Sequence, residues 1–321
     1  MKHLFFFLGL MAPVLLFSQE YSYRTLDLNL NDEAKIKSLT YKNLRLYPIK
    51  ARSTLKEQTK NFARYTSLKE ALDQKKIRIS EKDGKGEGAE VNTLYAQNTS
   101  SDTLFLMAGE VVQGGKQDRV IGEDVVIPPK SAKVKLPVFC VEQGRWSNAR
   151  NNNSNQFNNY YAVSGLSVRK AVEVDKNQSK VWEKVADGNS KNKVVTTTGA
   201  YTALKSAGDY QKTEKEYFNL LQPRLAAEKD VVGVIVVSGN KVIGCEIFAT
   251  EQLFRKSADN LLTSYIHEAV TNGKPVTITE ITVKKYMDDL LVNQADQEKK
   301  IKSKGKVFVS EGKKLHIAMY E

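Results

Sequence analysis

The sequence predicts an α+β fold with a mostly antiparallel β-sheet core, packed helices and a small C-terminal α/β addition. Strand-like and helix-like segments come in blocks, without the strict β-α-β alternation that is typical of parallel sheets. The clearest strands are residues 231–237 and 242–248, which flank Ser-Gly-Asn-Lys and predict a β-hairpin. The clearest helix is 253–270, where apolar residues recur at helical spacing. With 41% hydrophobic residues, the 321-residue chain can form a substantial core.

The N-terminus predicts export. A short basic start precedes the uncharged apolar run 4–17, which as a helix would span roughly 21 Å, less than the ~30 Å of a hydrocarbon core. This run and the small residue Ser18 are typical of a secretory signal, residues 1–18. We therefore expect a periplasmic or secreted protein without an integral membrane span.

Between residues 19 and 162 the pattern favours strands. Residues 19–42 form a polar lead-in, and Ser67 and Glu70 have the spacing of a capping box, which predicts a helix to about residue 74. A Thr-Ser-Ser-Asp turn joins the predicted strands 91–98 and 103–107, and the asparagine-rich residues 148–159 are expected to stay without order. The other strands are predicted at 44–49, where Pro48 marks an edge or an end, and at 77–79, 125–127 and 132–141.

The second half favours helices around the predicted hairpin. Helices are expected at 176–185 and 200–227, with Pro223 interrupting the latter. After residue 270 the pattern predicts a strand, a helix over 283–302 and two short strands around Ser310-Glu311-Gly312. The chain therefore divides into one domain over 43–270 and a strand-helix-hairpin extension over 271–321.

The net charge of +12 does not indicate nucleic-acid binding, because the lysines are spread along the chain with acids between them. The densest run is 299–314, where seven lysines fall within sixteen residues. This run is either a solvated tail or a weak, salt-sensitive contact for anionic envelope polymers.

Neither a metal nor a cofactor is predicted. No cluster of histidine and cysteine residues has metal-ligand spacing. Cys140 and Cys245 each fall on the apolar face of a predicted strand, so two buried thiols are favoured over a disulfide.

The segment 109–119 concentrates polar side chains among glycines, directly after the predicted strand 103–107. Its glycines would let backbone amides approach an anion, Lys116 would add a point charge, and Arg119 a planar fork. Gln117 stands where a Walker A loop has Ser or Thr. The alternative is a hairpin turn at Gly114-Gly115 with solvated side chains. The candidate residues are Glu110, Gln113, Gly114, Gly115, Lys116, Gln117 and Arg119.

A second candidate segment, 140–146, contains Glu142, Gln143, Arg145 and Trp146. Glu142 and Arg145 could pair while Trp146 caps the core. Alternatively, Trp146 supplies a stacking face and Arg145 an anion clamp beside the asparagine-rich loop.

The strings at 106–112, 116–120 and 140–146 closely resemble an uncharacterised prokaryotic domain family. It is named for gene association with ADP-ribosylglycohydrolases and rhodanese-phosphatase proteins, and the resemblance covers about 43–270. The sequence departs from the family at Val111, often an acid, at Asp118, usually Asn, and at Cys245, usually Asp. The first two departures weaken a carboxylate pair beside Glu110. The matching residues are Glu110, Lys116, Gln117, Arg119, Cys140, Glu142, Gln143, Gly144, Arg145 and Trp146.

The resemblance implies an association with ADP-ribose or NAD-derived metabolites but no established activity. We predict that the chain binds a small anionic, nucleotide-like ligand, provided that both candidate segments surround one solvent-reachable hollow. One alternative is a non-catalytic structural or interaction module, in which the polar motifs form a buried network. Another is a hydrolase with Glu110 or Glu142 as general base.

Overall fold

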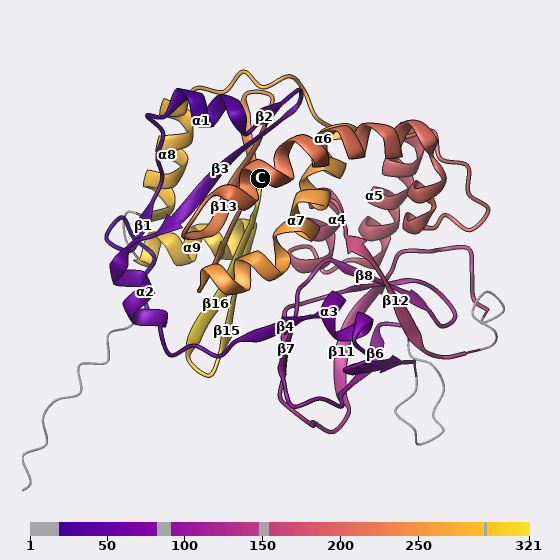
Figure 1. Ribbon diagram of the computed structural model, residues 1–321. Coiled ribbons are helices and arrows are strands. Elements are labelled where there is room, and N and C mark those ends of the chain that lie inside the picture. Colours follow the sequence, from indigo (N-terminus) through magenta and orange to yellow (C-terminus); the bar gives the residue numbers. More distant parts are fainter. Residues whose placement is uncertain (1–18, 82–90, 148–153, 292–293) are drawn as a thin grey trace, which may run out of the picture.

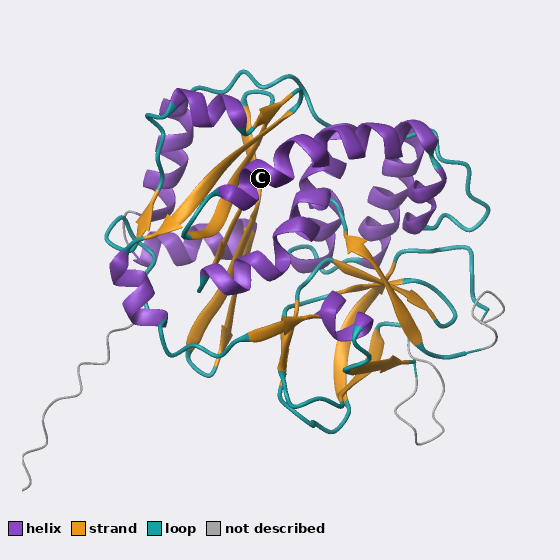
Figure 2. Cartoon of the chain, viewed as in Figure 1, coloured by secondary structure: helices purple, strands orange, loops and turns teal. Residues whose placement is uncertain are grey.

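The computed structural model describes residues 19–81, 91–147, 154–291 and 294–321 (Figure 1). The predicted signal segment 1–18 lies outside the described residues, as do 148–153 of the asparagine-rich segment. The α+β prediction is confirmed: the sheets are mostly antiparallel, and helices cover the largest of them (Figure 2).

The main sheet has seven strands in the order β1-β3-β13-β14-β16-β15, with β2 pairing the outer side of β3. The predicted hairpin is confirmed as β13 and β14, and every residue of β13 is buried. Side chains of β13 alternate between two hydrophobic clusters, so both faces of the sheet are covered. The strands are β1 Leu26–Asp27, β2 Thr40–Tyr41, β3 Leu44–Ala51, β13 Val231–Ser238, β14 Lys241–Phe248, β15 Gly305–Ser310 and β16 Lys313–Tyr320.

Pro48 lies in the middle of β3, in a stretch that is an edge only locally. On one side β3 pairs with β13, while on the other side β1 pairs only near Ala51 and β2 only near Leu44. The missing N–H of Pro48 therefore faces the interval between these two short strands, and Pro48 is at an edge only there. The predicted alternative that Pro48 ends the strand is wrong, because β3 continues to Ala51.

Helices cover the two faces of the main sheet. The predicted helix 253–270 is α7 Glu251–Thr271, which packs with α6 Gly208–Ala227 on one face. The opposite face is covered by α1 Glu33–Ser38, α2 Ser53–Thr59, α8 Glu280–Leu291 and, through Ile301, α9 Gln294–Lys304. Pro223 lies inside α6, so the predicted interruption there is wrong: Leu221 and Leu225 bury beside it and hold the helix together.

The C-terminal residues contribute to the main sheet itself. The predicted hairpin at Ser310–Gly312 is confirmed as β15 and β16, and β16 lies between β14 and β15. The single predicted helix over 283–302 is instead two helices, α8 and α9, and the strand predicted after residue 270 is wrong because 273–279 has no regular structure. The lysine-rich residues 299–314 are folded, so the tail interpretation is wrong, although their lysines are exposed or half-buried.

The second sheet is a nearly closed barrel of six strands in the order β12-β8-β9-β11-β6-β5. A bridge between Ser80 and Gln156 brings the first and last strands together, and apolar side chains such as Leu94, Ile121 and Val138 fill the interior. The strands are β5 Ile77–Ser80, β6 Thr93–Asn98, β8 Glu110–Gly114, β9 Arg119–Ile121, β11 Val134–Cys140 and β12 Phe157–Val163.

Three strands beside the barrel form a small sheet, β10-β7-β4, made of Val125–Ile127, Thr103–Leu106 and Tyr65–Ser67. The predicted strands 91–98 and 103–107 are both present as β6 and β7, but they belong to different sheets. Asn98 diverts the chain between them, because its side-chain amide donates to the carbonyls of Asp102, Ile127 and Pro128. The predicted capping box is confirmed at α3 Leu68–Asp73.

Helices also pack on the barrel. The helix predicted at 176–185 is α5 Gln178–Lys191, and the start of the predicted 200–227 helix is a separate 3₁₀ turn, Tyr201–Ser206. The sequence analysis missed α4 Leu166–Glu173, and it treated residues 157–159 as loop although they begin β12. In both cases burial against neighbouring elements overrides a weak local pattern.

Candidate functional site

The β8–β9 hairpin carries the first candidate segment at one end of the barrel. Gly115 has a φ of +48°, and a Cβ there would lie 2.5 Å from the Oε1 atom of Glu81. The turn amides are already used: Gly114 N–H donates to Asp118, Gly115 N–H to the Gln156 carbonyl, and Lys116 N–H to Glu81. The hairpin turn is therefore confirmed, but the expectation of solvated side chains is wrong, because Gln117, Asp118 and Arg119 are buried. The chain's own oxygens occupy the nest of amides.

Next to this turn lies a group of buried charges that we call the barrel-end cluster: Asp118, Glu142 and Arg145. Arg145 Nε lies 2.8 Å from Glu142 Oε2, and Arg145 Nη2 lies 3.2 Å from Asp118 Oδ1. Thr198 donates to Glu142 Oε1 and Thr202 to Asp118 Oδ2, each at 2.8 Å. The predicted Glu142–Arg145 pair is confirmed, and the cluster has few unused hydrogen-bonding groups.

Arg119 lies beside this cluster, but the cluster does not accept hydrogen bonds from all of its donors. The side chain is fully buried and faces the barrel interior with Cys140, its partner across β9 and β11. Its Nη1 atom donates to the Gln117 carbonyl at 2.9 Å, whereas Nε and Nη2 have no hydrogen-bond partner among the described residues. The nearest carboxylate, Glu81, is 3.9 Å from Nη2. Arg119 thus has two buried donors without a hydrogen-bond partner among the described residues.

Burial sets the electrostatics around Arg119. It lowers the pKa of the Arg119 guanidinium, an effect that the charge of Glu81 opposes. Burial also raises the pKa of the Cys140 thiol, although the positive charge of Arg119 acts to lower it. Cys140 therefore stays a neutral thiol that contacts the Gln117 side-chain oxygen, with a 3.0 Å separation. Cys245 is also buried and unpaired, which confirms the prediction of two free thiols.

Trp146 places an exposed aromatic ring at this end of the barrel. Its side chain is 49% exposed, so it does not cap the core. The Nζ atom of Lys116 lies 4.9 Å from the ring centroid and the Cζ atom of Arg119 lies 6.0 Å from it. One aromatic ring therefore joins a half-buried cation to a fully buried one.

The remaining predicted residues lie around this end of the barrel, except one. Gln117 is buried and donates to the carbonyl of Glu142, Gln143 is exposed, and Gln113 is half-buried near the end of β8. Glu110 begins β8, at the strand end opposite Gly114, and accepts from Met107 N–H at 2.7 Å. The structure therefore does not bring Glu110 together with the other candidate residues.

Glu110 borders a second buried group, which we call the inter-sheet network: Asp124, Arg169, Glu173, Glu246 and His316. His316 Nδ1 lies 2.6 Å from Asp124 and Nε2 lies 2.9 Å from Glu246, while both Arg169 terminal nitrogens contact Glu246. These residues come from α4, β14, β16 and the β9–β10 connection, so the network links the main sheet to the strands around the barrel. Gly109 has a φ of +89° and packs directly on the Arg169 side chain.

The pKa values of this network are strongly displaced. Burial alone would lower the pKa of His316, but Asp124 and Glu246 raise it to about 10. Burial would raise the pKa of Glu246, but Arg169 and His316 lower it to about 2. For Glu110 and Glu173, burial prevails and raises the pKa to about 8 and about 7. The sequence analysis missed the network because its members are scattered between residues 124 and 316.

The described part of the chain shows no group of three or more His, Cys, Asp or Glu side chains arranged to hold a metal ion. Within the same residues, no helix is both long and apolar enough to cross a bilayer. Export remains a prediction from residues 1–18, and contact of 299–314 with envelope polymers also remains a prediction.

Comparison with known proteins gives one family. A family model described as the ARG and Rhodanese-Phosphatase-superfamily-associated Protein domain matches residues 35–319. The match covers the barrel and nearly all of the main sheet, and it includes the C-terminal hairpin β15–β16. No match was found among curated proteins or among solved structures.

Proposed function

We propose, for a chain that belongs to the ARG and Rhodanese-Phosphatase-superfamily-associated Protein domain family, that the barrel end binds a small anionic ligand. The observation that carries the proposal is the buried Arg119 guanidinium, whose Nε and Nη2 donors have no partner among the described residues. A buried donor without a partner costs about 1–3 kcal/mol, and an anionic oxygen would remove that cost.

The two available donors define the chemistry of the ligand. Nε and Nη2 share one edge of the guanidinium plane, the edge that grips two oxygens of a phosphate or carboxylate. Lys116 adds a charge on the Trp146 ring, and the exposed ring offers a face for a base or a sugar. Together they favour a nucleotide-like anion such as ADP-ribose or an NAD-derived metabolite.

Glu142 and Arg145 support this site without belonging to it. Both oxygens of Glu142 already accept hydrogen bonds, from Thr198 on one side and from Arg145 on the other. Arg145 is also fixed to the Gly115 carbonyl at 2.8 Å, so it holds the turn that carries Lys116. We assign both residues a positioning role. In this respect they behave as the structural-module alternative expects, because they belong to a buried polar network.

The hydrolase alternative has less support. A general base must reach the proton that it abstracts, but Glu142 is fully buried with both oxygens engaged. Glu110 is also buried, and a pKa of about 8 keeps it mostly protonated at neutral pH. Binding without turnover is therefore the favoured function.

Calorimetric titration of the purified protein with ADP-ribose, NAD and nucleoside phosphates tests the proposal. We expect one of these to bind, and Lys116→Ala and Trp146→Ala to weaken that binding at unchanged melting temperature. Lys135→Ala is the matched control. The Nζ atom of Lys135 lies 5.9 Å from the centroid of the Tyr95 ring, on the same barrel but not at this end. If no ligand in the panel binds, or if all three variants bind like the wild type, the proposal is wrong.

A further inference from the structure

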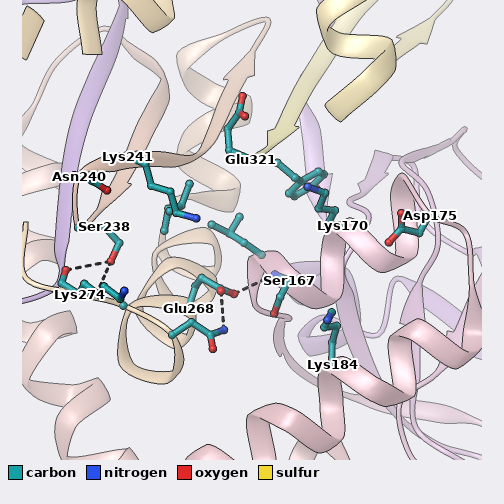
Figure 3. A pocket seen from close by; sticks show the side chains of 16 residues that line it. Ser167, Lys170, Asp175, Lys184, Ser238, Asn240, Lys241, Glu268, Lys274 and Glu321 are labelled. Atoms are coloured by element: carbon teal, nitrogen blue, oxygen red, sulfur yellow. Dashed lines mark hydrogen bonds between the residues drawn. The ribbon is translucent and has the colours of Figure 1, made fainter. Parts of the chain in front are cut away.

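A second candidate site is lined by residues far from Arg119 in the chain. A pocket of about 450 Å³ lies between α4, α5, the β13–β14 turn, the end of α7 and the last residues of the chain (Figure 3). We infer that this pocket, here called the lysine pocket, binds a compact polyphosphate anion. Its volume lies within the range of small-molecule sites, roughly 300–1,000 Å³.

Four lysines from separate segments line the lysine pocket: Lys170 on α4, Lys184 on α5, Lys241 at the start of β14, and Lys274 after α7. Lys184 pairs with its neighbour Glu183. Within the described ranges, the ammonium groups of Lys170, Lys241 and Lys274 make no ion pair.

Two of the three acidic residues that line the pocket pair with lysines outside it. Glu268 accepts from the backbone N–H of Ser167 at 3.0 Å and from Asn272 at 2.8 Å, as Figure 3 shows. Asp175 pairs with Lys180 at 3.3 Å, and Glu321 pairs with Lys304. Asp175 and Glu321 are paired with lysines, while three of the lining lysines are not, so the pocket keeps a net positive charge even with the Glu268 carboxylate counted.

The kind of cation sets the kind of ligand. A lysine ammonium is a compact point charge without the planar fork of arginine, so this site selects charge density over planar carboxylate geometry. The lysines lie on several sides of the pocket (Figure 3), and one small anion contacts only some of them. A chain of two or three phosphates reaches more of them, which favours tripolyphosphate over orthophosphate.

Titration with sodium tripolyphosphate, pyrophosphate and orthophosphate at low ionic strength tests the inference. We expect affinity to rise with the number of phosphates and to fall as salt is added. Lys170→Ala, Lys241→Ala and Lys274→Ala should each weaken tripolyphosphate binding roughly two- to fivefold, the effect of losing one exposed ion pair. The Lys241→Ala/Lys274→Ala double variant should weaken it about tenfold.

Lys229→Ala is the matched control, because Lys229 is exposed, forms no ion pair among the described residues and lies outside the lysine pocket. Equal losses in the control and the pocket variants would show non-specific attraction and overturn the inference, as would orthophosphate binding as tightly as tripolyphosphate. Tripolyphosphate has no ring to stack on Trp146, so its binding should persist in Trp146→Ala. This separates failure of the lysine pocket from failure of the proposed function.

Discussion

The two buried charge groups of this protein are built alike but placed differently. In each, an arginine contacts a fully buried carboxylate, Arg145 with Glu142 and Arg169 with Glu246. The barrel-end cluster draws its charges from within residues 118–145 and adjoins the half-exposed Trp146, whereas the inter-sheet network spans residues 124–316 and is enclosed. A polar group near the surface can serve a ligand, while an enclosed one joins parts of the fold.

Charge balance explains how the inter-sheet network tolerates enclosure. Its two cations, Arg169 and His316, face the carboxylates of Glu246 and Asp124. The raised pKa of nearby Glu110, about 8, keeps this acid mostly protonated near pH 7, and Glu173, with a pKa of about 7, is about half protonated there. The charges of the network therefore nearly balance, although the buried Nε of Arg169 has no hydrogen-bond partner among the described residues.

Glu246→Gln should produce the largest loss of stability. It removes the carboxylate that both Arg169 and His316 contact, which leaves two buried cations short of a partner. We expect the free energy of unfolding, measured by urea denaturation, to fall by about 3–5 kcal/mol. Asp73→Asn breaks only the exposed Lys69–Asp73 pair and should cost less than about 1 kcal/mol. Similar losses in the two variants would remove the distinction between buried and exposed pairs.

The pH dependence of stability distinguishes the two groups. His316 has a folded-state pKa of about 10, above the ordinary value of 6.5. Its contribution is therefore complete below pH 6.5 and is lost as pH rises through 10. Over that window the free energy of unfolding should fall by up to about 1.4 kcal/mol per pH unit from this group. Urea denaturation between pH 6 and 10 measures the slope, and an unchanged slope in His316→Gln would contradict the assignment.

Glu142→Gln tests the barrel-end cluster in the same way. The substitution keeps the shape of the side chain but removes the charge that Arg145 contacts, so about 2–3 kcal/mol of unfolding free energy should be lost. The loss should be smaller than in Glu246→Gln, because Glu142 contacts one cation and Glu246 contacts two. Equal or larger losses at Glu142 would reverse the comparison.

Gly115→Ala should cost about 2 kcal/mol, since it combines a left-handed backbone with a Cβ that meets Glu81. Gly312→Ala is the matched control: its φ is +74°, but nothing lies within 4 Å of the added Cβ. The control should lose only the backbone part, about 1 kcal/mol. Thermal unfolding of both variants measures the difference, and no difference would mean that Glu81 moves freely away from the turn.

Sequence reasoning succeeded where the signal is local. The β13–β14 hairpin, α7 and the Ser67–Glu70 capping box each depend on residues within one segment. The two candidate segments, expected to lie together, do meet, because β9 pairs with β11. Glu110 was grouped wrongly with Gly114, because the two residues lie at opposite ends of the five-residue strand β8, about 13 Å apart.

Long-range packing accounts for what the sequence did not reveal. Closure of the barrel depends on the Ser80–Gln156 bridge, and the inter-sheet network joins Asp124 to His316, which is far along the chain. Neither pairing has a local pattern. The sequence also could not predict the unpartnered donors of Arg119, because they depend on which acceptors lie near the folded side chain.

The most direct test of the central claim, that Arg119 and Trp146 form one anion site, uses the fluorescence of Trp146. The chain has two tryptophans, so Trp182→Phe leaves Trp146 as the single reporter. We expect titration with ADP-ribose or a related nucleotide to change its emission saturably, and Arg119→Lys, which keeps the charge but loses the fork, to abolish that change. If the emission of the folded Trp182→Phe protein does not respond to any of these ligands, or responds equally with lysine at position 119, the claim is contradicted.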